Sequence, residues 1–295
     1  MDIRPLFCDI DDFCKAFEPL INRRLLAQGA KHRCKPSGLQ TSEVMTILVL
    51  FHSSGYRNLK TFYTEHVMTH YAGAFPRLPS YNRFVELQRD SLIPLWCYLH
   101  TRFGDCTGIS FVDATTLAVC HNLRIPQHKV FCGSAARGKS SMGWFYGFKL
   151  HLVINDCGEL LGCYLTPGNV DDRQPVPGMV AELWGKLFGD RGYISQTLTA
   201  LLQAQNLQLV TKIKKNMRNR LLSISDKLLL RKRSLIETVN DQLKNISQIE
   251  HTRHRSLWNF LGNLAAGLIA YSWREKKPSL GIRVKEQLHL PAVVC

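Results

Sequence analysis

The chain has 295 residues, of which 45% are hydrophobic and 21% are charged, a composition that fits a folded globular protein and excludes a largely disordered one. Lysine and arginine number 38 against 23 aspartates and glutamates, so the net charge is +15. This excess favours a polyanionic partner, nucleic acid before anionic membrane, over a protein that is merely basic.

Residues 1–104 are predicted to be helical. One helix is expected up to Phe51, and another over Tyr81 to about Leu92 after a serine that can cap it. Helices separated by a glycine turn and a loop are typical of a helix-turn-helix DNA reader, but a plain bundle packed on the next domain fits the same pattern. The side chains of the last helix that would face DNA are Asn82, Arg83 and Gln88.

Strands are predicted from Gly108 onward. The first is Phe111–Leu117, with a single carboxylate, Asp113, near its end. The runs Trp144–Ile154 and Glu159–Thr166 flank an Asn-Asp-Cys-Gly turn and predict a hairpin. Between the first strand and the hairpin, residues 121–143 are basic and glycine-rich, which predicts a long exposed loop.

After the hairpin, strands are predicted to alternate with helices. A helix begins at Asp171 or Asp172 and runs to about Leu183, and a brief buried strand follows that ends in the glycine-flanked Asp190. A capped helix from Ser195 and a strand over Leu207–Ile213 come next. This alternation predicts an α/β domain with a mixed sheet.

The segment from residue 212 to residue 233, called the basic segment below, holds nine basic residues and one acid. Such a run is usually a solvated face, but beside an active site it favours a surface that contacts DNA phosphates. The residues within it that we expect at DNA are Lys212, Lys214, Lys215 and Arg218.

A long helix is predicted from Lys232 to about Ile246. Beside its apolar stripe, helical spacing places four charged residues on one polar face: Arg233, Glu237, Asp241 and Lys244. A closing helix is predicted over Leu257–Trp273, and residues 274–295 are expected to form a basic, loosely ordered tail.

Ten scattered cysteines include no Cys-x-x-Cys pair, which argues against a zinc ribbon and against a compact disulfide framework. Reduced thiols in a cytosolic protein are therefore expected. The N-terminus has no signal pattern, and Leu257–Trp273 is short for a membrane span and is interrupted by Asn259 and Asn263. No membrane partner is expected.

Three carboxylates could converge on one edge of the sheet. Asp113 and Asp190 both end predicted strands, and Glu237 lies on a helix whose apolar stripe should pack on the sheet. Oxygen ligands of this kind suit Mg²⁺ or Mn²⁺, and two such ions could activate the attacking oxygen and stabilise the leaving one in phosphodiester displacement. Taken singly, each acid could equally be a turn residue or an ion-pair partner.

Four stretches resemble the DDE transposases of bacterial insertion sequences: Phe-Val-Asp at 111–113, Gly-Phe-Lys-Leu-His at 147–151, Thr-Pro-Gly-Asn-Val-Asp-Asp at 166–172 and Gly-Asp-Arg-Gly-Tyr at 189–193. Arg233, Glu237 and Lys244 match the Arg, Glu and Lys of the family's Tyr-x-x-Arg-x-x-x-Glu-x-x-x-x-x-x-Lys signature, although residue 230 is Leu instead of Tyr. The resemblance covers about residues 108–272.

The resemblance implies an RNase H-like catalytic domain over 105–273 after an all-α DNA-binding domain over 1–104. It implies Asp113, Asp190 and Glu237 as catalytic Mg²⁺ or Mn²⁺ ligands, and Arg233 and Lys244 as contacts to DNA phosphates. The implied activity is cleavage at the element's terminal inverted repeats and transfer of the 3′ hydroxyl to target DNA. The expected partners are double-stranded DNA and further copies of the chain, which would synapse as a homo-oligomer at the bacterial nucleoid in the cytoplasm. A nuclease that only cuts, and an inactive DNA-binding relative, remain as alternatives.

Overall fold

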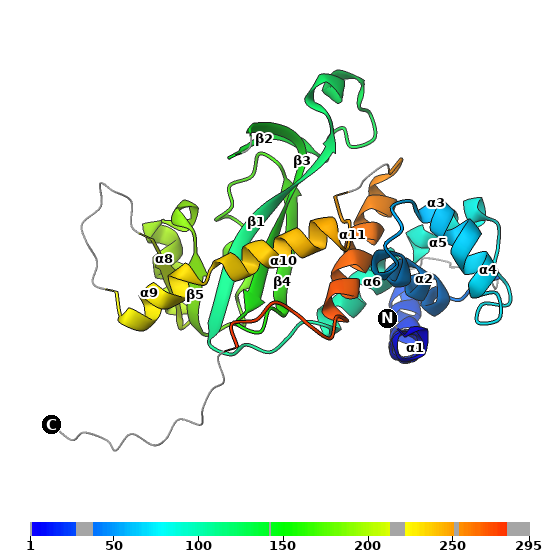
Figure 1. Ribbon diagram of the computed structural model, residues 1–295, viewed down its shortest axis with the longest axis horizontal. Helices are drawn as coiled ribbons and strands as arrows, with labels where there is room; N and C mark the ends of the chain where they lie inside the picture. Colours follow the sequence, from blue (N-terminus) through cyan, green and yellow to red (C-terminus); the bar gives the residue numbers. More distant parts are fainter. Residues whose placement is uncertain (1, 28–37, 142, 213–221, 251–253, 282–295) are drawn as a thin grey trace, which may run out of the picture.

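The computed structural model describes residues 2–27, 38–141, 143–212, 222–250 and 254–281. A curved sheet carries helices on both faces, and a group of helices built from the first hundred residues lies at one end of it (Figure 1). The predicted α/β fold class, a mixed sheet with flanking helices after a helical N-terminal region, is confirmed.

The sheet is built around β1 (Ile109–Cys120). On one side β1 pairs antiparallel with β3 (Gly143–Asn155), which pairs in turn with β4 (Leu160–Pro167) and β2 (Ala136–Ser140). On the other side β1 pairs parallel with β5 (Gly185–Gly189), and β5 pairs parallel with β6 (Leu207–Thr211). The mixed sheet therefore has antiparallel strands on one side of β1 and parallel strands on the other.

The predicted hairpin is formed by β3 and β4. Asn155 Oδ1 accepts the backbone N–H of Cys157 at 3.0 Å and of Glu159 at 2.9 Å, so one side chain organises the turn. Gly158 has a φ of +74°, and a Cβ there would lie 2.0 Å from the Pro278 carbonyl oxygen. Only glycine fits this close approach of the chain that follows the closing helix.

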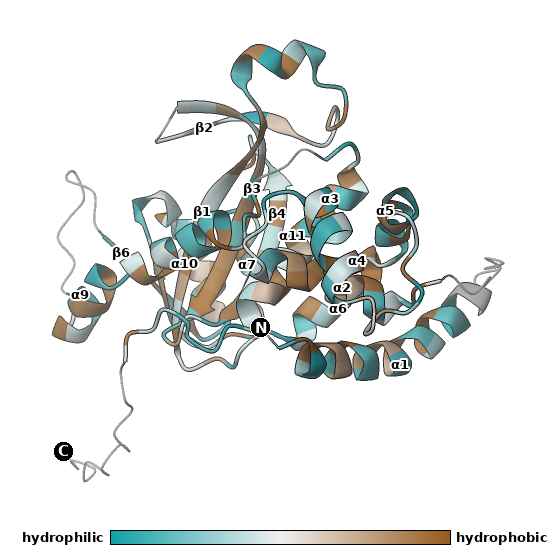
Figure 2. Cartoon of the chain, turned by 45° about the vertical axis from the view of Figure 1, so that its right-hand side comes forward, coloured by the Kyte–Doolittle hydropathy of each residue, from teal (hydrophilic) through white to brown (hydrophobic). Residues whose placement is uncertain are grey.

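The two faces of the sheet bury different sets of residues because neighbouring side chains on a strand point in opposite directions. Val112 and Val153 belong to the core beneath α8 (Gln196–Ala204), whereas Phe111 and Ile154 belong to the core beneath α10 (Ser234–Asn245). Figure 2 shows brown, hydrophobic stretches in the strands of the sheet. The helix α9 (Ile224–Arg231) lies beside β5 and β6.

The N-terminal region is helical, as predicted. Its elements are α1 (Ile3–Ala27), α2 (Thr41–Ser53), α3 (Leu59–Thr61), η1 (Phe62–Val67), α4 (Met68–His70), α5 (Tyr81–Asp90) and α6 (Leu92–Thr101). The closing helix α11 (Leu257–Ser272) packs against α2, α5 and α6, so the helical region and the sheet share one hydrophobic core. The domain boundaries near 104 and 273 stay predictions.

Two expected elements differ from those observed. The predicted helix from Asp171 to Leu183 is only α7 (Val176–Met179), because Pro175 and Pro177 disrupt it. The predicted exposed loop 121–143 contains the short helix η2 (Asn122–Gln127) and the edge strand β2.

The end of the chain follows the sheet for some residues after α11. Leu280 N donates to the Asp156 carbonyl at 2.9 Å, and Arg274 Nη1 donates to Gln242 Oε1 at 3.0 Å. The rest of the predicted tail, 282–295, lies outside the described residues. Within the described part of the chain, no helix combines the length and apolar character needed to cross a membrane.

Candidate active site

Asp113 lies where two strands of the sheet part. The parallel pairing of β1 with β5 ends at Phe111 opposite Phe188, β5 ends at Gly189, and Asp190 follows directly. The sequence predicts Asp113 at the end of its strand, but β1 continues to Cys120 along β3. The Asp113 side chain lies on the face of β1 that α10 covers, the same face as Phe111. Both aspartates lie beside the carboxyl end of β5.

Asp190 is held by a tight turn. Its Oδ1 accepts the Gly192 backbone N–H at 2.7 Å and caps the short helix η3 (Arg191–Tyr193). A Cβ at residue 192 would lie 2.9 Å from that same oxygen, and one at Gly189 would lie 3.1 Å from the Tyr193 ring. In the Gly-Asp-Arg-Gly-Tyr sequence, Gly192 thus leaves room for the Asp190 carboxylate, and Gly189 leaves room for the Tyr193 ring.

The third carboxylate reaches the site on α10. Arg233 lies between two acids: its Nη2 is 2.5 Å from Glu237 Oε1, and its Nη1 is 3.5 Å from Asp113 Oδ1. One turn after Glu237, Asn240 Nδ2 donates to Asp113 Oδ2 at 3.0 Å. The apolar stripe that holds α10 on the sheet consists of Leu235, Ile236, Val239 and Leu243. Glu237 remains 55% exposed at the side chain, so a ligand from solvent can reach it.

The three carboxylates interact electrostatically. Burial raises the pKa of Asp113 to about 6; the charges of Asp190 and Glu237 add to this shift, and Arg233 opposes it. Burial also raises the pKa of Tyr193 far above its usual range, helped by Asp113 and two further aspartates. The Tyr193 hydroxyl is buried and has no hydrogen-bond partner among the described residues. Negative charge is therefore concentrated at this point of the fold.

The donor chemistry suits a hard divalent cation. The three acids offer only oxygen ligands, which Mg²⁺ and Mn²⁺ prefer, and a cation would offset the burial and the neighbouring negative charges that raise the Asp113 pKa. The positions of the three acids match a metal site only in part, because Glu237 forms an ion pair with the Arg233 guanidinium. Across the described ranges, no group of three or more His, Cys, Asp or Glu side chains is arranged to hold a metal ion.

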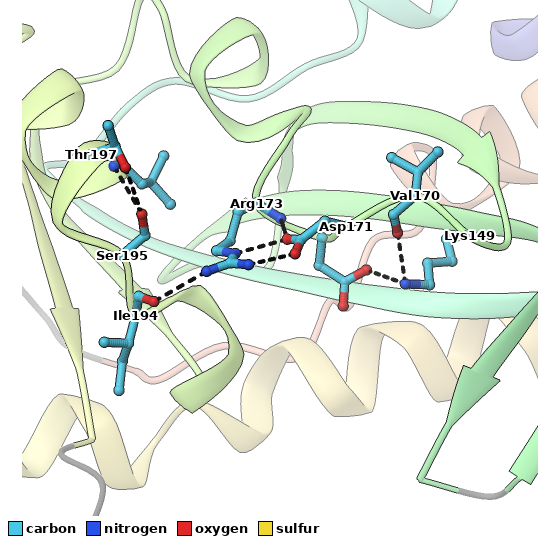
Figure 3. A network of polar contacts seen from close by, with 9 residues as sticks. Lys149, Val170, Asp171, Arg173, Ile194, Ser195 and Thr197 are labelled. Atoms are coloured by element: carbon cyan, nitrogen blue, oxygen red, sulfur yellow. Dashed lines mark hydrogen bonds and ion pairs between the residues drawn. The ribbon is translucent and has the colours of Figure 1, made fainter.

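A second polar network ties the loop after β4 to the Asp190 turn (Figure 3). Arg173 donates to both carboxylate oxygens of Asp171, at 2.8 Å and 2.5 Å, and to the Ile194 carbonyl at 3.4 Å. Beside it, Lys149 Nζ donates to Asp172 Oδ1 at 2.8 Å and to the Val170 carbonyl at 2.9 Å. Arg173 thus connects the loop to the residue that follows η3, four positions after Asp190.

We expect Arg173→Gln to lower DNA cleavage on the order of tenfold, since outer partners of a metal site contribute about 10–100-fold. The glutamine cannot hold Asp171 with two bonds and reach Ile194 at once, so the Asp190 turn loses its support. Single-turnover cleavage rates measure the effect, and Arg124→Gln, an exposed arginine on η2, serves as the charge-matched control. Equal rates for Arg173→Gln and wild type would show that the network plays no part in positioning Asp190.

The residues expected at DNA have different surroundings. Lys212 is exposed just after β6, whereas Lys214, Lys215 and Arg218 lie outside the described residues. Lys244 Nζ is 3.2 Å from Glu250 Oε2, so it is paired rather than free. On α5, Asn82 and Arg83 are exposed, but Gln88 is 5% exposed and packed inward.

Several residues near the site were not singled out by sequence reasoning. Asn240 bonds Asp113, and its position three residues after Glu237 on the same helix face was the available signal. Tyr193, Asp172 and Lys149 lie in stretches that carry the resemblance, but no chemical pattern in the sequence assigned them a place. Their proximity depends on the strand order, which single-residue patterns do not contain.

Comparison with known proteins gives one strong result. The family model described as "Transposase DDE domain" matches residues 103–257, which is more than half of the chain. No curated protein matches.

Two solved structures resemble the chain weakly. The first is "Crystal structure of the Mos1 Strand Transfer Complex", 11% identical over 80% of this chain and 81% of that one, with a TM-score of 0.23. The second is "Crystal structure of a pre-cleavage Mos1 transpososome", 11% identical over 83% and 82%, with a TM-score of 0.23. With scores this low, neither structure bears on the function.

Proposed function

The chain belongs to the transposase DDE domain family, and from this premise we propose that it cleaves DNA at the terminal inverted repeats of a bacterial insertion sequence and joins the freed 3′ hydroxyl to target DNA. One observation supports the proposal. Asp113 and Glu237, two of the three acids that we assign to the active site, share Arg233, and the third, Asp190, lies close enough to raise the Asp113 pKa.

We propose that Asp113, Asp190 and Glu237 hold Mg²⁺, or Mn²⁺ in its place. When bound, such ions polarise the scissile phosphate and lower the pKa of the attacking hydroxyl or water. Asn240 keeps the Asp113 carboxylate oriented through its hydrogen bond. Arg233 can exchange its carboxylate partners for a DNA phosphate, since a guanidinium binds both groups by the same paired geometry. That exchange frees Glu237 as DNA enters.

Double-stranded DNA is the proposed partner, both as element ends and as target. The basic segment, with Lys212, Lys214, Lys215 and Arg218, lies in the chain between β6 and α10 and can follow the DNA backbone toward the carboxylates. Lys244 would add a further phosphate contact by releasing Glu250. We propose that the helical region over residues 1–104 recognises the element ends, and that copies of the chain assemble on DNA at the nucleoid in the cytoplasm.

The experiment uses full-length protein, Mg²⁺, a DNA fragment that ends in the terminal repeat, and a supercoiled target plasmid. A transposase gives both cut ends and joined products in which the fragment is linked to the plasmid. Cut ends without joined products would indicate the nuclease alternative. Binding without either product would indicate a catalytically inactive relative, an alternative favoured by the ion pair that occupies Glu237.

Neutralising the basic segment at Lys212, Lys214 and Lys215 should weaken binding to all DNA sequences alike. Phosphate contacts release counterions but carry no sequence information, so the slope of log affinity against log salt should fall by about 0.9 for each phosphate that the variant no longer neutralises. Affinities for terminal-repeat and random duplexes at several salt concentrations measure both effects. A loss of affinity confined to one sequence would show that these lysines read bases instead.

A further inference from the structure

A cleft of about 1150 Å³ lies between the N-terminal helices and the sheet. Its walls come from α3, α5, the far end of β1, the start of β3 and the start of α11. In Figure 1 these helices lie together beside the end of the sheet that is remote from α8 and α9. The first β1 residue that lines the cleft, Ala118, is five residues past Asp113, or about 16 Å along an extended strand. The cleft is thus separate from the three carboxylates.

The cleft is lined by amide groups that lack partners. Gln88 is 5% exposed, yet its Nε2 has no hydrogen-bond partner within the described part of the chain. Leaving such a group unpaired in the folded protein is unfavourable. The side chains of Asn82 and Asn259 also make no hydrogen bond to the described residues. Each amide offers a donor and an acceptor, the combination that pairs with the edge of a nucleobase.

The charge of the cleft favours an anion. Arg57 and Arg255 are exposed at its wall and have no carboxylate partner among the described residues. Glu250 is the one acid among the lining residues, and Lys244 at 3.2 Å compensates its charge. Two guanidinium groups beside neutral amides suit a phosphodiester that carries bases.

An aromatic surface completes the lining. The Trp144 side chain is 59% exposed at the start of β3, although large apolar side chains are usually buried. An exposed indole gives a nucleobase a face on which to stack. Tyr81, at the start of α5, provides a second, half-buried ring.

We propose that this cleft binds a short unpaired stretch of DNA strand. Arg57 and Arg255 hold its phosphates, Trp144 stacks a base, and Asn82, Gln88 and Asn259 read base edges. A duplex would not place its bases in the cleft. The base edges of a duplex lie in the DNA major groove, about 12 Å wide, and a protein reads them with a helix or strand pair that enters this groove. The inference rests on the proposed function, because it takes DNA as the ligand. It adds a separate binding site for DNA strands that are unpaired near the cut ends.

The test compares two forms of DNA on the full-length protein. Fluorescence anisotropy measures the affinity for a labelled 12-nucleotide single strand and for a duplex of the same sequence, at one fixed salt concentration. Trp144→Ala/Asn259→Ala should bind the single strand at least tenfold more weakly and the duplex within twofold of wild type. The control Trp184→Ala/Gln203→Ala removes an exposed indole and an exposed amide outside the cleft, and it should change neither affinity.

Two further measurements test the base contacts. An abasic single strand should bind wild type about as weakly as the normal strand binds the double variant, and the double variant should not distinguish the two strands. Gln88→Leu keeps the side chain's size and removes an unpaired amide, so its thermal midpoint should equal or exceed that of wild type while single-strand affinity falls.

The outcomes separate this site from the general function. If wild type binds duplex DNA and the cleft variants keep the wild-type affinity for the single strand, only the inference is wrong. The cleft would then bind another ligand, such as a peptide. Equal losses of affinity for duplex and single strand would also overturn it. If wild type binds neither form of DNA, the proposed function fails together with the inference.

Discussion

Purified Glu237→Gln protein is expected to fold and to bind duplex DNA, but to cleave terminal-repeat DNA with Mg²⁺ on the order of 100-fold more slowly than wild type or worse. Outer partners of metal sites alone contribute about 10–100-fold, and a direct ligand should contribute at least as much. Folding survives because the change touches an exposed side chain and leaves the buried stripe of α10 intact. DNA affinity should hold or rise, because one negative charge near the phosphates is removed.

A control on another exposed acid separates this role from a general loss of surface charge. Glu182, before β5, is exposed and lies outside both the N-terminal helices and the basic segment. Losing the surface pair of Arg233 with Glu237 should cost only about 0.3–0.5 kcal/mol of stability, and Glu182→Gln should cleave at the wild-type rate. If Glu237→Gln cleaves as fast as Glu182→Gln, then Glu237 is only a helix-surface partner of Arg233 and has no place in the active site.

Local sequence patterns predicted the structure correctly where a feature depends on residues of a single element. The β3–β4 hairpin depends on Asn155 and Gly158, which both lie in the turn itself. The apolar stripe of α10 and the spacing of Arg233 to Glu237 are fixed by helical period, and both are present as predicted. The fold class followed from these elements in order.

Patterns failed where strands that are distant in the sequence determine the structure. Aspartate is rare inside strands, so the sequence predicts Asp113 at a strand end, but β1 continues past it since β3 pairs along its whole length. The polar side chain lies on the face of β1 that α10 covers. In the sequence Asn240 is one more polar helix residue, and only the packing of α10 on β1 brings it to Asp113. The cleft with Gln88 likewise depends on how α5 meets α11.

The surroundings of Asp113 also imply a conflict between stability and activity. Its carboxylate is largely buried, next to Asp190, and its pKa is raised from 3.8 to about 6. A group whose pKa is higher in the folded state favours folding fully only below its unfolded pKa, and that contribution is lost as the pH rises through the folded value. In EDTA, the free energy of unfolding of the wild type should therefore lose this contribution between about pH 4 and pH 6.

Asp113→Asn should then abolish cleavage and, without metal, stabilise the fold at pH 7.5. A shift of about two pKa units corresponds to about 3 kcal/mol, and the weakened contact with Arg233 at 3.5 Å offsets part of this gain. A net gain of about 1–2 kcal/mol would raise the thermal midpoint by about 2–8 °C. The gain should vanish below about pH 4, where wild-type Asp113 is protonated as well.

The control variant, Asp171→Asn, should change the stability in the opposite direction. Bonds from Arg173 lower the pKa of Asp171 to about 2, so Asp171→Asn should destabilise the protein at pH 7.5. Thermal unfolding of both variants in EDTA at pH 4 and pH 7.5, beside cleavage assays in Mg²⁺, provides the comparison. If Asp113→Asn lowers the midpoint at pH 7.5, the Asp113 charge is satisfied by Arg233 and Asn240 alone. The site would then hold a structural ion pair, and the buried Asp113 charge would impose no cost for a metal ion to offset.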